Sequence, residues 1–128
     1  MEKTPVAKKV MIVDDSRTVR QQVVAALGPA GFEVLEAQDG VEALDRMKGT
    51  PDLSLIFCDL NMPRMNGLEM LGVVKESGGF TVPVIMLTTE GRNDIIEKAK
   101  RAGARGWLVK PFKPDQLVAV ARKLTGTN

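Results

Sequence analysis

Short apolar runs alternate five times with amphipathic helical patterns along the 128 residues of this chain. Apolar residues follow each run at intervals of three or four, the spacing that predicts one buried helix face. Strict strand–helix alternation favours a parallel sheet with helices on both faces. The chain is therefore predicted to be one α/β domain, a doubly wound sheet of five strands with five helices. The expected strands are residues 9–15, 32–37, 53–59, 82–89 and 106–112.

The expected domain spans residues 9–125, and the ends at 1–8 and 126–128 are predicted to be flexible. The length suits one compact domain, and we expect a monomer. There is no apolar run of about 18 residues and no apolar stretch after the charged N-terminus, so we expect neither a membrane span nor a signal peptide. The single cysteine, Cys58, has no intramolecular disulfide partner, which suits the reducing cytoplasm.

Polar side chains stand where four of the five apolar runs end. In a parallel sheet the carboxyl ends of the strands share one edge, and open α/β sheets bind ligands there, beside the point where the strand order reverses. Four separate segments thus direct polar groups to one place, which favours a functional site over isolated turn formers or helix caps. These residues are Asp14 and Asp15, Asp59, Thr88 and Lys110.

The chemistry of this set points to a divalent cation and a phosphoryl group. Two like charges about 4 Å apart repel by about 4 kcal/mol at an effective dielectric constant of about 20, so three clustered carboxylates need more than Lys110 to offset them. Oxygen ligands without histidine or cysteine favour Mg²⁺. A carboxylate can also act as the nucleophile in aspartyl-phosphate chemistry, with cations neutralising the phosphoryl charge. The chain has no histidine, so any phosphohistidine would lie on a partner.

Four motifs, "VDDS", "DLNMPRMNG", "LTTE" and "GWLVKPF", resemble those of response-regulator receiver domains in order and spacing. The resemblance extends from about Lys8 to Leu124 and is strongest to the stand-alone, CheY-like chemotaxis regulators. It implies the flavodoxin-like, CheY-like fold with strand order 2-1-3-4-5.

The resemblance also implies roles for individual residues. Asp59 matches the phosphoacceptor, and Asp14 and Asp15 match the acidic pair that holds Mg²⁺ together with Asp59. The backbone carbonyl of Asn61 matches a further metal ligand. Lys110 matches the lysine that contacts the phosphoryl group, and the bond between Lys110 and Pro111 matches a position where the family usually has a cis peptide.

Two further pairs complete the comparison. Thr88 and Trp107 match the hydroxyl and the aromatic residue that switch on phosphorylation, although the family usually has tyrosine or phenylalanine in place of Trp107. Asn61 and Glu90 match positions that tune how fast the acyl phosphate hydrolyses, and we expect this chain to clear its own phosphate quickly.

The implied function is that of a single-domain response regulator in chemotaxis, a switch rather than an enzyme. A CheA-like histidine kinase would supply the phosphoryl group. The output would be a protein such as the flagellar motor switch, bound by the face of the fourth helix, fifth strand and fifth helix, and a phosphatase is a further expected partner. This face lies in the basic part of the chain, since residues 91–128 carry a net charge of +6. Ile96 is assigned equally to this face and to the core. No nucleic-acid or membrane partner is expected.

Three other kinds of protein share part of this pattern. A phosphorelay intermediate or a phosphate sink would have the same fold and site, with a longer-lived phosphoryl group. A haloacid-dehalogenase-like phosphatase is disfavoured because the lone acceptor follows the third strand, position 61 is asparagine and no cap domain fits. A flavodoxin is disfavoured because Asp14 and Asp15 would repel the flavin phosphate.

Overall fold

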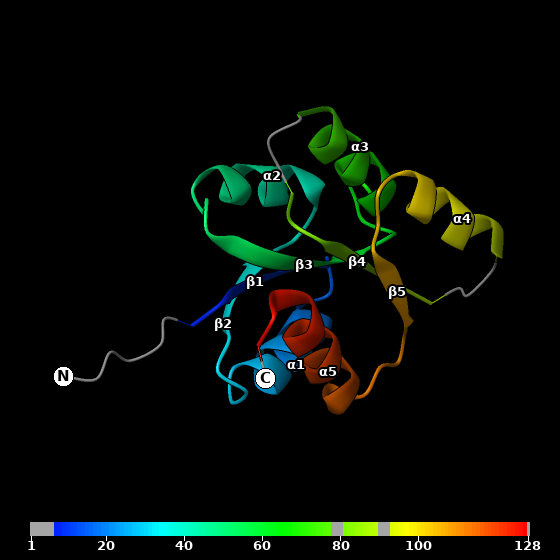
Figure 1. The fold of residues 1–128 in the computed structure, drawn as a ribbon. Coiled ribbons are helices and arrows are strands. Elements are labelled where there is room, and N and C mark those ends of the chain that lie inside the picture. Colours follow the sequence, from blue (N-terminus) through cyan, green and yellow to red (C-terminus); the bar gives the residue numbers. More distant parts are fainter. Residues whose placement is uncertain (1–6, 78–80, 90–92, 128) are drawn as a thin grey trace.

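The computed structural model describes residues 7–77, 81–89 and 93–127. Five parallel strands form one sheet in the order β2-β1-β3-β4-β5, and five helices connect and cover them (Figure 1). This confirms the predicted architecture and strand order. The strands are β1 Lys9–Val13, β2 Glu33–Ala37, β3 Leu53–Asp59, β4 Val84–Thr88 and β5 Gly106–Val109, and the helices are α1 Arg17–Leu27, α2 Gly40–Lys48, α3 Gly67–Ser77, α4 Asn93–Arg101 and α5 Pro114–Thr125.

Four strands are shorter than predicted, and three of them end or begin next to polar residues or prolines. β1 ends at Val13, before the two aspartates, and β2 begins one residue late, at Glu33. β4 begins only after Pro83, and β5 ends at Val109, two residues before Pro111. Proline has no N–H to donate, so it is excluded from the interior of a ladder.

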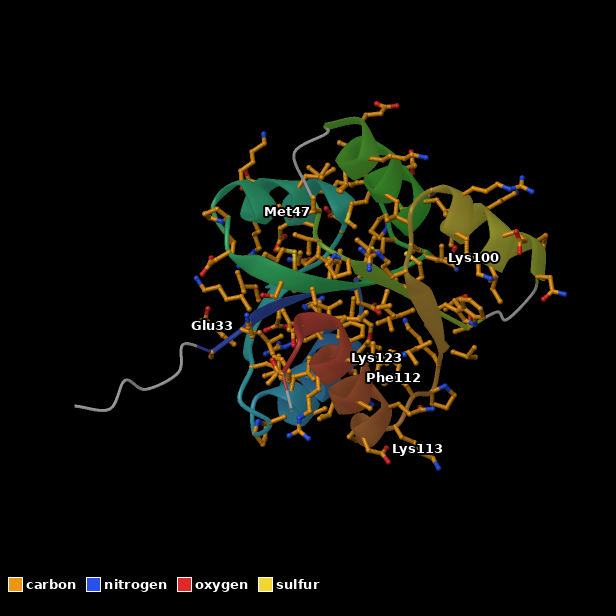
Figure 2. The ribbon with its side chains drawn as sticks, viewed as in Figure 1. Glu33, Met47, Lys100, Phe112, Lys113 and Lys123 are labelled. Carbon is orange, nitrogen blue, oxygen red and sulfur yellow. The ribbon has the colours of Figure 1, made fainter. Side chains whose placement is uncertain are left out.

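The helices form two layers. Helices α1 and α5 cover one face of the sheet, and α2, α3 and α4 cover the other (Figure 1). Each layer encloses its own apolar core, one around Phe57 and Leu117 and the other around Met47 and Met70. Met47 lies between α2 and the sheet, as Figure 2 shows. Among the described residues, no helix is long and apolar enough to cross a membrane.

Open parallel sheets bind ligands beside the point where the strand order reverses, which in this chain lies at the carboxyl ends of β1 and β3. The chain leaves β1 toward β2 on one side and reaches β3 on the other side, so β1 and β3 mark the reversal of strand order. Ser16 caps α1 by accepting a hydrogen bond from the Val19 N–H at 3.3 Å, which starts the helix immediately after the β1 loop. The loops after β1 and β3 therefore face each other across this edge.

Candidate functional site

Asp59 is the last residue of β3 and is 7% exposed. Its backbone is held by the turn that follows, in which Leu60 donates to the Leu87 carbonyl and Gly67 donates to the Leu60 carbonyl, both at 3.1 Å. A Cβ on Gly67 would lie 2.5 Å from the Asp59 carbonyl oxygen and 2.6 Å from Met86 Cε. Only glycine fits there, and its close approach fixes α3 against the end of β3.

Asp14 and Asp15 form the loop after β1. Asp14 is fully buried, and its N–H donates to the Ala37 carbonyl at 3.0 Å. Its Oδ1 accepts from the Ser16 N–H at 2.9 Å. Asp15 is exposed. One carboxylate oxygen from each of Asp14, Asp15 and Asp59 lies within 4.8 Å of the others, so the predicted acidic cluster is present.

Lys110 follows β5 and lies between two of these carboxylates. Its Nζ is 2.8 Å from Asp14 Oδ2 and 3.4 Å from Asp59 Oδ1. Burial acts to lower the pKa of Lys110, but the two carboxylates outweigh it and the pKa is raised. The peptide bond between Lys110 and Pro111 is cis, as expected.

Lys110 offsets only part of the negative charge around the Asp59 carboxyl. Burial and the neighbouring Asp14 charge raise its pKa, outweighing Lys110 and the hydrogen bond from the Asn61 backbone. The three carboxylates form an oxygen-only ligand set of the kind that hard divalent cations bind. The arrangement of this chain therefore fits a metal ion.

Thr88 ends β4 and is 2% exposed. It lines a hollow of about 280 Å³ that separates the loop after β3 from α4, with Asn61 and Lys98 among the other lining residues. The predicted switch hydroxyl thus lies on the same sheet edge as the acidic cluster.

Trp107 lies on β5 with its side chain directed outward. It pairs in register with Met86 of β4, is 38% exposed and has the Lys100 Nζ 5.0 Å from its ring centroid. Lys100 lies on α4, which flanks β5 (Figure 2). The indole therefore stacks against a cation on the α4 side rather than joining the acidic cluster. Glu90, expected to tune dephosphorylation, lies outside the described residues.

Sequence reasoning missed three residues beside this site. Arg20 donates through Nη1 to the Asp14 carbonyl at 2.7 Å, and its Nε bonds to Glu36 Oε1 at 3.1 Å. Its position one helical turn after Ser16 could have indicated a return toward the β1 loop. Arg64, in the loop after β3, forms an ion pair with Asp39, the N-cap of α2. The distance between the two residues in the sequence gave no signal of this contact.

The chain resembles known proteins over almost its whole length. The model of the response regulator receiver domain family matches residues 10–122. The chain is 39% identical over 122 residues to the chemotaxis protein CheY1 of Helicobacter pylori, covering 94% of this chain and 98% of that protein. It is also 39% identical over 121 residues to the chemotaxis protein CheY homolog of Campylobacter jejuni, covering 93% of each chain.

Solved structures agree with the sequence matches. The chemotaxis protein CheY4 of Vibrio cholerae superposes with a TM-score of 0.86 at 39% identity, over 92% of this chain and 98% of that one. CheY in the CheX–CheY–BeF3–Mg complex of Borrelia burgdorferi superposes with a TM-score of 0.84 at 27% identity, over 91% of this chain and 87% of that one. The chain therefore belongs to the response regulator receiver domain family, and it is a response regulator of the chemotaxis type.

Proposed function

We propose that this protein accepts a phosphoryl group on Asp59 from a CheA-like histidine kinase and then changes its affinity for a chemotaxis target. The observation that carries the proposal is the placement of Lys110 Nζ, 3.4 Å from the Asp59 carboxylate, within a cluster of three carboxylates. A buried nucleophile beside a fixed cation is what transfer of a charged phosphoryl group requires.

The transfer begins with Asp59. A carboxylate oxygen of Asp59 attacks the phosphorus of the partner's phosphohistidine, the P–N bond breaks, and its electron pair returns to the imidazole. The Lys110 ammonium neutralises part of the negative charge on the phosphoryl oxygens. Asp14, Asp15, Asp59 and the Asn61 backbone carbonyl would hold Mg²⁺, which when bound supplies further neutralisation of that charge. The buried Asp14 keeps Lys110 in place through their 2.8 Å contact.

The output follows from Thr88 and Trp107. The Thr88 hydroxyl would turn toward the new phosphoryl group, and the Trp107 indole would leave Lys100 and move inward with it. The face built from α4, β5 and α5 then changes, and we propose a flagellar motor switch protein as its target. A ligand shifts such an equilibrium only by its differential affinity for the two states.

Return to the resting state completes the cycle. We propose that Asn61 and Glu90 orient the water that hydrolyses the acyl phosphate, and that a phosphatase assists. The similar CheY of Borrelia burgdorferi forms a complex with a second protein, CheX. The cycle is placed in the cytoplasm, where the lone thiol of Cys58 stays reduced. Asn61→Ala should lengthen the lifetime of the phosphorylated form, and an unchanged lifetime would contradict this role.

Intact mass spectrometry tests the acceptor directly. The wild type, Asp59→Asn and the matched control Asp45→Asn, an exposed carboxylate on α2, are incubated with acetyl phosphate in Mg²⁺ or EDTA. One phosphoryl adduct is expected on the wild type and the control, in Mg²⁺ only. An equal adduct on Asp59→Asn would overturn the assignment, and a long-lived adduct would favour a phosphorelay intermediate or phosphate sink over a fast chemotaxis switch.

A further inference from the structure

The loop after β3, residues 60–66, rests on the start of α2. The Gly40 N–H donates to the Met65 carbonyl at 3.2 Å. A Cβ on Gly40 would lie 2.7 Å from Met65 Cγ, so the side chain of Met65 fills the space beside this glycine. The far side of the loop is therefore packed against another helix and is not free to move alone.

Arg64 adds a charged contact at the tip of this loop. It has a positive φ of 63°, a conformation that residues with a Cβ rarely adopt. Its Nε and Nη2 lie 2.8 Å and 2.6 Å from Asp39 Oδ2. A strained backbone persists only where surrounding contacts hold it, and this ion pair is such a contact.

Asp39 is the buried partner in this pair. It is 4% exposed, and its other oxygen, Oδ1, caps α2 by accepting from the Glu42 N–H at 2.9 Å. Burial acts to raise the pKa of Asp39, but the Glu42 N–H and the Arg64 guanidinium outweigh it and the pKa is lowered. One carboxylate therefore ties the helix start and the loop tip together.

The same segment is also tied to the other side of the acidic cluster. The Ala37 carbonyl, two residues before Asp39, accepts the Asp14 N–H at 3.0 Å. The end of β2 thus bonds to the loop after β1 through Ala37, and Asp39, two residues later, binds the loop after β3 through Arg64. The connection from β2 to α2 spans the two loops that carry the candidate metal ligands.

We propose that Asp39 and Arg64 form a clamp that fixes the spacing of the two loops and thereby sets the affinity of the acidic cluster for Mg²⁺. They are positioning residues, since neither belongs to the cluster itself. The inference rests on the metal site of the proposed function. Carboxylates repel one another without the ion, so loops that are not clamped relax apart and must be drawn together when it binds. Groups outside the ligand set tune metal affinity in this way.

Three substitutions isolate the clamp. Arg64→Asn removes the guanidinium but keeps a residue that tolerates the left-handed backbone. Arg64→Lys keeps the charge without the planar fork, and Asp39→Asn keeps an oxygen for the cap while removing the charge. Arg122→Asn, on the exposed last turn of α5, is the charge-matched control.

Isothermal titration of each protein with MgCl₂ gives the affinity, and urea denaturation in EDTA gives the metal-free stability. Arg64→Asn should bind Mg²⁺ about tenfold more weakly than the wild type, the lower end of the range for substitutions that disturb how metal ligands are held. Arg64→Lys should lie between them, and Arg122→Asn should match the wild type. Asp39→Asn combined with Arg64→Asn should bind no more weakly than the weaker single variant, because both remove one interaction.

The outcomes separate the clamp from the proposed function. A variant of Arg64 that loses stability but binds Mg²⁺ like the wild type would show a purely structural contact and overturn the clamp, while leaving the metal site intact. Additive losses in the double variant would also overturn it. A wild type that binds no Mg²⁺ would overturn the metal site and, with it, the clamp's role.

Discussion

Asp59→Asn is expected to stabilise the metal-free protein at neutral pH. The carboxylate oxygens of Asp14, Asp15 and Asp59 lie within 4.8 Å of one another, so each pair repels by about 3.5 kcal/mol or more at an effective dielectric constant of about 20. The Lys110 Nζ lies 3.4 Å from Asp59 Oδ1 and attracts the ionised carboxylate by about 5 kcal/mol at the same dielectric constant. The two repulsions on Asp59 therefore exceed the attraction by about 2 kcal/mol. Water screening of the exposed Asp15 lowers this difference and desolvation of the Asp59 carboxylate raises it, so the net penalty on ionised Asp59 is about 1–2 kcal/mol.

The pH dependence follows from the raised pKa of Asp59. A carboxyl that binds its proton more tightly in the native state adds stability below its unfolded pKa and loses it as the pH rises through the native pKa. The ionised Asp59 therefore weakens the fold most at neutral pH. The advantage of Asp59→Asn should shrink as the medium is acidified through the native pKa and vanish below the unfolded value.

Magnesium should reverse the order of stability. A ligand present at about 100 times its dissociation constant stabilises the native state by about 2.7 kcal/mol. Only the wild type should gain the full stabilisation from bound Mg²⁺, because Asp59→Asn removes one metal ligand. Urea denaturation of both proteins in EDTA and in MgCl₂ measures the two effects, with the exposed Asp45→Asn as a control expected within about 0.5 kcal/mol of the wild type. If Asp59→Asn were less stable than the wild type in EDTA, the charge reasoning would be refuted.

Three further substitutions test other parts of the structure. Lys100→Ala removes a cation–π contact worth about 0.5–1 kcal/mol, so acrylamide should quench Trp107, the only tryptophan, more strongly; unchanged quenching would contradict the contact. Gly67→Ala forces a Cβ against the Asp59 carbonyl and should cost about 3 kcal/mol of unfolding free energy in urea, whereas a loss below about 0.5 kcal/mol would show that the turn has room. Ser16→Ala removes the cap of α1 and should lower that free energy by about 1 kcal/mol, and a neutral result in the same assay would argue against the cap.

The elements that the sequence predicted best are those with uniform surroundings. β3 has the predicted bounds, Leu53–Asp59, because a central strand buried on both faces is one unbroken apolar run. The predicted length of β5 was too great, because β5 is a short edge strand and half of its side chains face outward. The sequence assigns Ile96 equally to the core and to a partner-binding face, and in the structure its side chain is buried, with 8% exposure. A pattern of apolar residues predicts that a segment is a helix. It predicts only approximately which side chains of that helix are covered by neighbouring elements.

The acidic cluster was predictable for a related reason. Its members follow β1 or end β3, which are neighbours in the sheet, and a parallel sheet brings the carboxyl ends of its strands to one edge whatever the details of packing. The ion pair between Arg64 and Asp39 was not predictable from the sequence. Arg64 meets Asp39 from 25 positions away, and its positive φ is one that no rule would assign to arginine. Such contacts depend on how two loops meet, which local patterns do not encode.

The sequence by itself therefore determined the α/β class, the five strand–helix units and the residues gathered at one edge, because these depend on periodicity and on the order of polar residues along the chain. Only the tertiary structure decided the charge balance at Asp59, the outward stacking of Trp107 on Lys100 and the link between Asp39 and Arg64. Each of these depends on distances of a few ångströms between separate elements. Electrostatic and hydrogen-bond energies change steeply over such distances, and only packing fixes them.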